Sequence, residues 1–206
     1  MASPMAMIKK GGNATALAAA LLAAGAVGVM PTDTIYGIVG SALEERTVER
    51  IYRLRRRNRK KPMIVLIAGT GDLRRFGIVP SPRAARVLRR VWPGKVSVIL
   101  PCPSRKFAYL HRGTGTVAFR MPASAPLRAF LARTGPLVAP SANIEGEKPA
   151  RTPAEAKRYF GDRVEFYAAA RGASKRSSAA KPSTLIALAK DGAVTVLRKG
   201  AGRVVL

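Results

Sequence analysis

Two short polar segments of this chain each follow an apolar run, and both carry side chains that can bind a polar or anionic ligand. Residues 31–37 read PTDTIYG after the run 26–30, and residues 139–143 read APSAN after the run that begins at Leu137. Short apolar runs predict buried strands, and α/β proteins commonly bind ligands where such strands end. Each segment has a proline near its start, and Gly37 closes the first with the freedom to turn back. We therefore interpret both as parts of one ligand site, although either alone is also typical of an ordinary turn.

A strongly basic stretch follows the first segment. Eight of the twelve residues from 50 to 61 are arginine or lysine. The guanidinium group of arginine binds two phosphate oxygens at once, so this stretch is suited to holding a triphosphate. Cations near the end of a helix also complement the helix dipole, and that is the alternative explanation for any single one of them.

The remaining side chains exclude several kinds of chemistry. Asp33 is the one acid that we place in a candidate site loop, and no pair of carboxylates indicates a glycosidase or a carboxylate cage for a metal. We interpret the single histidine, His111, as an incidental surface residue and the single cysteine, Cys102, as a small buried or loop residue. Hydroxyls, amides and cations remain, and they suit attack on a nucleotide phosphate, where the substrates carry the reactivity. We expect no metal site in the protein, and any Mg²⁺ to arrive with the nucleotide.

Composition limits the class of protein. With 206 residues, 48% of them hydrophobic, the chain is long enough for one core, and we expect a single domain over 1–206. The net charge of +26 favours contact with polyanions such as nucleotides or tRNA, although an Arg-rich composition can also reflect a general compositional bias. One cysteine excludes an internal disulfide. The apolar stretch 14–30 is short and interrupted by glycine, so we expect a soluble cytoplasmic protein rather than a membrane span or signal peptide.

Hydrophobic periodicity predicts both helices and strands. The predicted helices are 15–24, 43–55, 81–91, 125–133 and 153–159, the last opened by a capping box of Thr152 and Glu155. The predicted strands are 26–30, 63–68, 96–100, 116–120, 137–139, 164–168, 184–188 and 194–198. Helices first alternate with strands and the last strands then cluster, so we expect a mixed sheet covered by helices. The polar segment 171–182 is the best candidate for a mobile loop.

Seven strings of this sequence resemble the YrdC-like family, the short form of threonylcarbamoyl-AMP synthase. PTDTIYG, KPMIVLI, WPGKVSVILP, TVAFRMP, APSAN, PSTLI and LRKG occur in the order and spacing of that family, from about residue 11 to residue 200. The resemblance implies an α+β fold, in which a twisted mixed β-sheet flanked by helices surrounds a basic cavity.

The same resemblance implies a reaction. L-Threonine and bicarbonate or CO₂ would form a carbamate, whose oxygen would attack the α-phosphate of ATP and release pyrophosphate. A separate tRNA threonylcarbamoyl transferase complex would then pass the threonylcarbamoyl group to adenosine in tRNA. Direct contact with tRNA through the basic surface is a further possibility that the net charge of +26 raises.

The family's functional positions can be matched residue by residue. Arg55 and Arg57 match the catalytic basic motif. The positions that hold threonine in the family match Thr34, Arg120, Ser141 and Ser183. The positions that hold ATP match Arg57, Thr116, Asn143 and Arg198, with Lys61 and Thr152 as looser candidates.

Two positions depart from the family pattern. The Lys-x-Arg motif is here Arg55-Arg56-Arg57, which keeps the charge and loses the compact ammonium of lysine. Leu66 stands where many relatives have a histidine near the threonine site. These departures and the high charge leave open an RNA-binding or ribosome-assembly factor of the same fold without synthase activity. A carbamoyl-adenylate enzyme for hydrogenase maturation is a third reading, weakened because such domains normally sit within longer chains.

Overall fold

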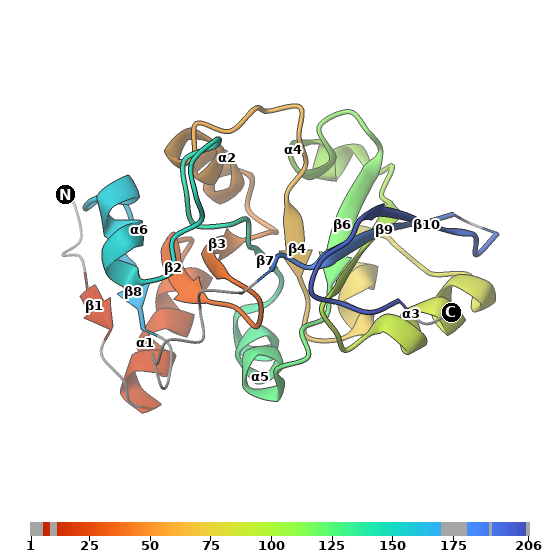
Figure 1. Ribbon diagram of the computed structural model, residues 1–206, viewed down its shortest axis with the longest axis horizontal. Helices are drawn as coiled ribbons and strands as arrows, with labels where there is room; N and C mark the ends of the chain where they lie inside the picture. The colour runs from red at the N-terminus through yellow and green to blue at the C-terminus, as the bar shows by residue number, and fades with distance from the viewer. Residues whose placement is uncertain (1–5, 9–11, 170–180, 190, 205–206) are drawn as a thin grey trace.

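The computed structural model describes residues 6–8, 12–169, 181–189 and 191–204. Within these residues the strands form one ten-stranded mixed sheet in the order β1-β8-β2-β3-β7-β4-β6-β5-β9-β10. Figure 1 shows β10 at the far edge of the molecule from β1, in agreement with this order. The strands are β1 Ala6–Ile8, β2 Gly28–Pro31, β3 Tyr36–Ser41, β4 Ile64–Leu66, β5 Val96–Pro101, β6 Thr116–Arg120, β7 Leu137–Val138, β8 Phe166–Ala168, β9 Thr184–Leu188 and β10 Val194–Arg198.

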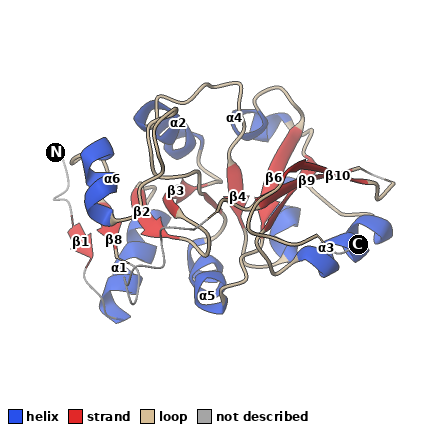
Figure 2. Ribbon diagram, in the orientation of Figure 1, coloured by secondary structure: helices blue, strands red, loops and turns tan. Residues whose placement is uncertain are grey.

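Helices lie on both sides of these strands (Figure 2). The α-helices are α1 Gly12–Ala23, α2 Glu45–Leu54, α3 Pro82–Val91, α4 Ala108–His111, α5 Ala125–Thr134 and α6 Pro153–Phe160. Two short 3₁₀ helices cover Thr70–Phe76 and Arg105–Phe107. Ser81 and Ser124 cap α3 and α5, because each hydroxyl accepts a hydrogen bond from a backbone amide of the first turn. In the described part of the chain, no helix combines the length and apolar character needed to cross a membrane.

The sequence-based elements are largely confirmed, and the mixed sheet covered by helices is present. The bounds of β6, β9 and β10 agree with the prediction, whereas β1, β3 and α4 were not predicted. The predicted capping box at α6 is half formed. The Thr152 hydroxyl accepts from the Glu155 amide, but the Glu155 carboxylate accepts from the Arg151 amide instead of the cap residue itself. Most of the predicted loop 171–182 lies outside the described residues.

The first polar segment proved to be part of a hairpin. β2 and β3 pair antiparallel, with Pro31 opposite Tyr36 and Met30 opposite Gly37. Gly37 therefore lies inside a strand, and the expectation that it turns the chain back is wrong. Its lack of a side chain serves a close approach, because a Cβ atom there would lie 3.3 Å from the Pro140 carbonyl oxygen. The turn itself is made by Thr32, whose hydroxyl donates to the Ile35 carbonyl oxygen at 2.6 Å.

The central strands bury one face fully and the other only in part. On β5 and β9, Val98 and Ile186 are fully buried, and they lie beside each other in the sheet. Their neighbours Ile99 and Ala187 point to the opposite face and are partly exposed. Side chains from α1 and α5 cover this second face over β3, β4 and β7, through a cluster that includes Leu66. The less covered half of the face therefore lies over β6, β5 and β9, where β6 ends at Arg120.

One close contact of the sheet tests this packing. A Cβ atom at Gly28 would lie 2.2 Å from ring atoms of Phe166, which is fully buried. We expect Gly28→Ala to lower the free energy of unfolding by about 2 kcal/mol, because an overpacked core forces side chains and backbone to shift. Gly71→Ala is the control, since a Cβ atom there meets no atom within 4 Å. Urea denaturation measures both variants, and similar unfolding midpoints for the two would contradict the packing described here.

Candidate functional site

The two polar segments lie side by side in the folded chain. Gly37 and Ser141 form an antiparallel bridge, the Ala142 amide donates to the Tyr36 carbonyl oxygen at 2.9 Å, and the Ile38 amide donates to the Pro140 carbonyl oxygen at 3.0 Å. These bonds join the start of β3 to the stretch that follows β7. Groups that are more than 100 residues apart in the sequence are thus brought into one region.

Arg55 connects this region to the basic stretch at the end of α2. Its Nε donates to the Asn143 carbonyl oxygen at 3.1 Å, and its Nη2 donates to Ser141 Oγ and Asn143 Oδ1, both at 3.2 Å. Arg55 is only 3% exposed, and its Nη1 has no hydrogen-bond partner among the described residues. Burial, reinforced by the charge of Arg57, lowers the pKa of Arg55 to about 10. Arg55 is therefore a buried cation at neutral pH, with one donor group left unused.

The end of the basic stretch, residues 57–61, forms a loop held by backbone carbonyl groups and by two acids, Glu145 and, at Arg59, Glu49. Arg57 donates from Nε to the Lys61 carbonyl oxygen at 3.2 Å and from Nη2 to the Pro62 carbonyl oxygen at 3.0 Å. Glu145 accepts from the Lys61 ammonium at 3.0 Å and from the Asn58 amide. The expectation that Asp33 is the only acid of the candidate loops is therefore wrong. Glu145 lies two residues after APSAN, and an acid so close to a candidate segment in a strongly basic chain is the feature of the sequence that could have identified it.

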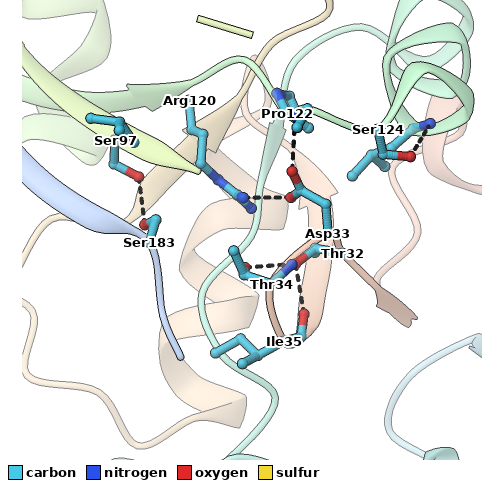
Figure 3. Close-up of polar contacts among 12 residues, drawn as sticks. Thr32, Asp33, Thr34, Ile35, Ser97, Arg120, Pro122, Ser124 and Ser183 are labelled. Carbon is cyan, nitrogen blue, oxygen red and sulfur yellow. Dashed lines mark hydrogen bonds and ion pairs between the residues drawn. The ribbon is translucent and has the colours of Figure 1, made fainter. Parts of the chain in front are cut away.

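A second buried arginine ends β6. Arg120 donates from Nη1 to Asp33 Oδ1, and the other oxygen of Asp33 accepts from the Ala123 amide at 2.9 Å. Figure 3 shows Arg120 directed at Asp33 across the tip of the β2–β3 hairpin. The two side chains are 4% and 7% exposed, and Arg120 Nε has no partner in the part of the chain that the structure describes. Burial lowers the pKa of Arg120, and the neighbouring charge of Asp33 opposes that shift.

Hydroxyl groups flank Arg120 on two sides (Figure 3). The Thr34 and Thr32 hydroxyls lie 3.1 Å apart in the hairpin turn, and the Ser97 and Ser183 hydroxyls lie 2.8 Å apart between β5 and the start of β9. Val98 pairs with Phe119, so Ser97 lies opposite Arg120 in the sheet. Ser97 was not identified from the sequence, because only this register relates it to Arg120. Alternation of side chains also places Ser97 and Arg120 on the same, less covered face.

Three further residues named from the sequence lie apart from this cluster or are already engaged. Arg198 donates to the Ser183 carbonyl oxygen at 2.9 Å, which brings it to the same strand end. Thr116 begins β6 and lies about 13 Å along the strand from Arg120, on the same face. Thr152 caps α6, and its hydroxyl is engaged by the Glu155 amide. The structure thus brings most of the named residues together, with Thr116 and Thr152 at the margin.

Leu66, His111 and Cys102 are all buried. Leu66 pairs with Arg120 and Leu137 at the end of β4 and is 1% exposed among side chains of α1 and α5. His111 is buried, so its interpretation as a surface residue is wrong, and its Nδ1 accepts from the Gly113 amide at 3.2 Å. Cys102 is buried as expected, and burial raises the pKa of its thiol.

Comparison with known proteins gives matches along most of the chain. The Sua5/YciO/YrdC family, described as "Telomere recombination", matches residues 20–200. A threonylcarbamoyl-AMP synthase of Bacillus subtilis is 40% identical over 143 residues, which are 68% of this chain and 41% of that relative. This chain therefore matches less than half of the length of that relative. A threonylcarbamoyl-AMP synthase of Thiobacillus denitrificans is 35% identical over 171 residues, which are 82% of this chain and 88% of the other.

Solved structures agree with the fold. Sua5 of P. abyssi, determined in complex with L-threonine, has a TM-score of 0.81 and 28% identity, and the match covers 93% of this chain and 55% of that one. YciO of E. coli has a TM-score of 0.79 and 22% identity over 97% and 95% of the two chains, a similarity that shows the fold alone. The match over residues 20–200 and the identity to the Thiobacillus denitrificans relative establish that the chain belongs to the Sua5/YciO/YrdC family.

Proposed function

We propose that this protein makes threonylcarbamoyl-AMP from L-threonine, bicarbonate or CO₂, and ATP, and releases pyrophosphate. The observation that carries the proposal is the pair of buried arginines, Arg55 at the end of α2 and Arg120 at the end of β6, each with an unused donor group. Unpaired donors on buried cations favour anionic ligands, and both ATP and an amino acid carry anionic groups. Curated relatives named threonylcarbamoyl-AMP synthase support the same reaction.

Threonine would bind at Arg120. The guanidinium would hold the amino-acid carboxylate. The hydroxyls of Thr34, Ser141 and Ser183 would form hydrogen bonds with the polar groups of threonine. Asp33 already fixes one end of the guanidinium, which orients the remaining N–H groups before the ligand arrives. The structure of a relative with L-threonine bound supports an amino-acid site in this fold.

ATP would bind beside it, against the basic loop. Arg55 and Arg57 would stabilise charge on the phosphates, with Lys61, Asn143 and Arg198 as further contacts and Thr116 and Thr152 at the margin. The carbamate oxygen would attack the α-phosphorus while the bond from that phosphorus to the bridging oxygen of the β-phosphate breaks, and pyrophosphate leaves with the bond electrons. Fixed cations near the leaving phosphates stabilise the charge that develops there.

The side chains do not fit a resident metal ion. Within the described residues, no three His, Cys, Asp or Glu side chains are grouped so that they could hold one. Mg²⁺ that accompanies ATP would therefore be held mainly by phosphate oxygens and water, as is common for this ion.

The product would serve the modification of tRNA. A separate transferase complex would take up the threonylcarbamoyl group, and the net charge of +26 would favour passing contact with tRNA. The alternative of an RNA-binding factor without synthase activity is not favoured, because curated relatives across several organisms are named as synthases.

The reaction itself is the first test. Purified protein is expected to release pyrophosphate from ATP only when L-threonine and bicarbonate are both present, because the carbamate is the nucleophile. A coupled pyrophosphate assay with each substrate omitted in turn measures this dependence. Equal release without threonine would contradict the proposal, and salt-sensitive tRNA binding with no turnover would favour the RNA-binding alternative.

Arg57 gives a test of the phosphate site. We expect Arg57→Ala to lower kcat/KM for ATP by about 100-fold, since one lost donor to the transition state has an effect of that order. Loss of its two bonds to backbone carbonyls should change the free energy of unfolding by only about 1 kcal/mol. Arg59→Ala is the matched control, because Arg59 is 64% exposed and pairs with Glu49. Steady-state kinetics and thermal melts of both variants measure these effects. Equal activity of the two variants would show that Arg57 does not contribute to the phosphate site.

The ion pair of Asp33 and Arg120 gives a test of how the Arg120 guanidinium is held in place. We expect Asp33→Asn to lower the free energy of unfolding by about 3 kcal/mol, because it leaves a buried cation without its counter-charge. Combining it with Arg120→Met should cost much less than the sum of the single changes. Asp162→Asn is the control, since that side chain is 78% exposed. Denaturation of all four proteins of the cycle measures the coupling, and additive costs would show that the pair does not interact.

A further inference from the structure

The carboxylate of Glu145 lies where several positive groups of the basic loop converge. It accepts from the Asn58 amide and from the Lys61 ammonium at 3.0 Å, and Arg57 adds its charge nearby. These contacts lower the pKa of Glu145, with the amide of Asn58 as the largest cause. The charge of Glu145 in turn acts on Arg55, whose pKa it raises against the effect of burial.

This combination of donors is the kind that binds phosphate. A backbone N–H, a lysine ammonium and arginine side chains from one loop make a concentrated positive field, and phosphate oxygens accept hydrogen bonds from all three. The chain has 11 acidic and 37 basic residues, so the placing of an acid in the middle of these donors reduces the charge of the loop when no ligand is bound. The Glu145 carboxylate is 26% exposed, so it can leave for water without crossing the core.

We propose that the Glu145 carboxylate occupies a phosphate position of the ATP site until the triphosphate binds and displaces it. This inference rests on the proposed function. The Glu145 amide donates to the Arg55 carbonyl oxygen at 2.8 Å, and that bond does not involve the side chain. The carboxylate can therefore swing out while the backbone keeps the loop after Asn143 against Arg55.

Displacement has a consequence at each end of the reaction. When the triphosphate binds, it must compete with the Glu145 carboxylate for the same donors. The affinity for phosphate is therefore lower than it would be if these donors were free. When pyrophosphate leaves, the carboxylate returns to Asn58 and Lys61, which keeps the cations paired and favours product release. A merely structural brace would have the opposite effect on binding, since removing a brace disorders the loop and weakens the site.

The direct test is the affinity for inorganic tripolyphosphate, measured by calorimetry without threonine or bicarbonate. Glu145→Gln is expected to bind it about fivefold more tightly than the unaltered protein, as loss of a competing, partly exposed ion pair predicts. Glu147→Gln is the matched control, since it removes the same charge from an exposed side chain two positions away. An affinity of Glu145→Gln that is equal to or weaker than that of the control would overturn the proposal and indicate a brace.

A second measurement avoids substitution. The pKa of Glu145 in the unaltered protein can be followed by carboxyl-carbon NMR, and it is expected to rise when tripolyphosphate takes the donors and places negative charge nearby. An unchanged or lowered pKa on binding would overturn the proposal even if the variant does not fold. Neither measurement uses turnover, so a failure of the proposed synthase reaction would show separately, as absent pyrophosphate release by the unaltered protein.

Discussion

The site depends on keeping two guanidinium groups charged where water is largely excluded. Transfer of an ion out of water costs several kcal/mol even after the protein relaxes, so each buried cation needs oxygen acceptors in fixed positions. Arg55 obtains them from Ser141 and Asn143, and Arg120 obtains them from Asp33. These acceptors come from segments far away in the sequence, so the sheet must form in its native register before the cations are satisfied. Assembly of the site therefore depends on the folded sheet.

The two arginines are balanced differently, and this suits two different anions. Arg120 has a full counter-charge in Asp33, so its unused donor favours a ligand of modest charge such as an amino-acid carboxylate. Arg55 is held by neutral oxygens, and its pKa is lowered mainly by burial and further by the charge of Arg57, while the charge of Glu145 raises it. The region around it therefore retains an excess of positive charge, which suits a triphosphate. The two ends of the site differ in net charge because Arg120 is bound by a carboxylate and Arg55 is bound by neutral oxygens.

The sequence identified the elements with strong periodicity and the polar segments, but not the relations between elements. The run Thr116–Arg120 and the strand Thr184–Leu188 were predicted with their observed bounds. The strand Tyr36–Ser41 was missed because its two glycines resemble a turn, although each glycine admits a close neighbour, Pro140 at Gly37 and Thr47 at Gly40. Ser97 was missed for another reason, since its position opposite Arg120 exists only in the folded register.

The position of Leu66 limits how protons can be handled. It pairs with Arg120 and is enclosed by apolar side chains, so no histidine accepts a proton at that point of β4. His111 is buried elsewhere with Nδ1 engaged, and both oxygens of Asp33 already accept hydrogen bonds. A carbamate oxygen is already anionic and needs no base for its attack on phosphorus. In the proposed reaction, the proton of the threonine ammonium would then pass to bicarbonate or water, which is consistent with a protein that contributes position and charge rather than a base.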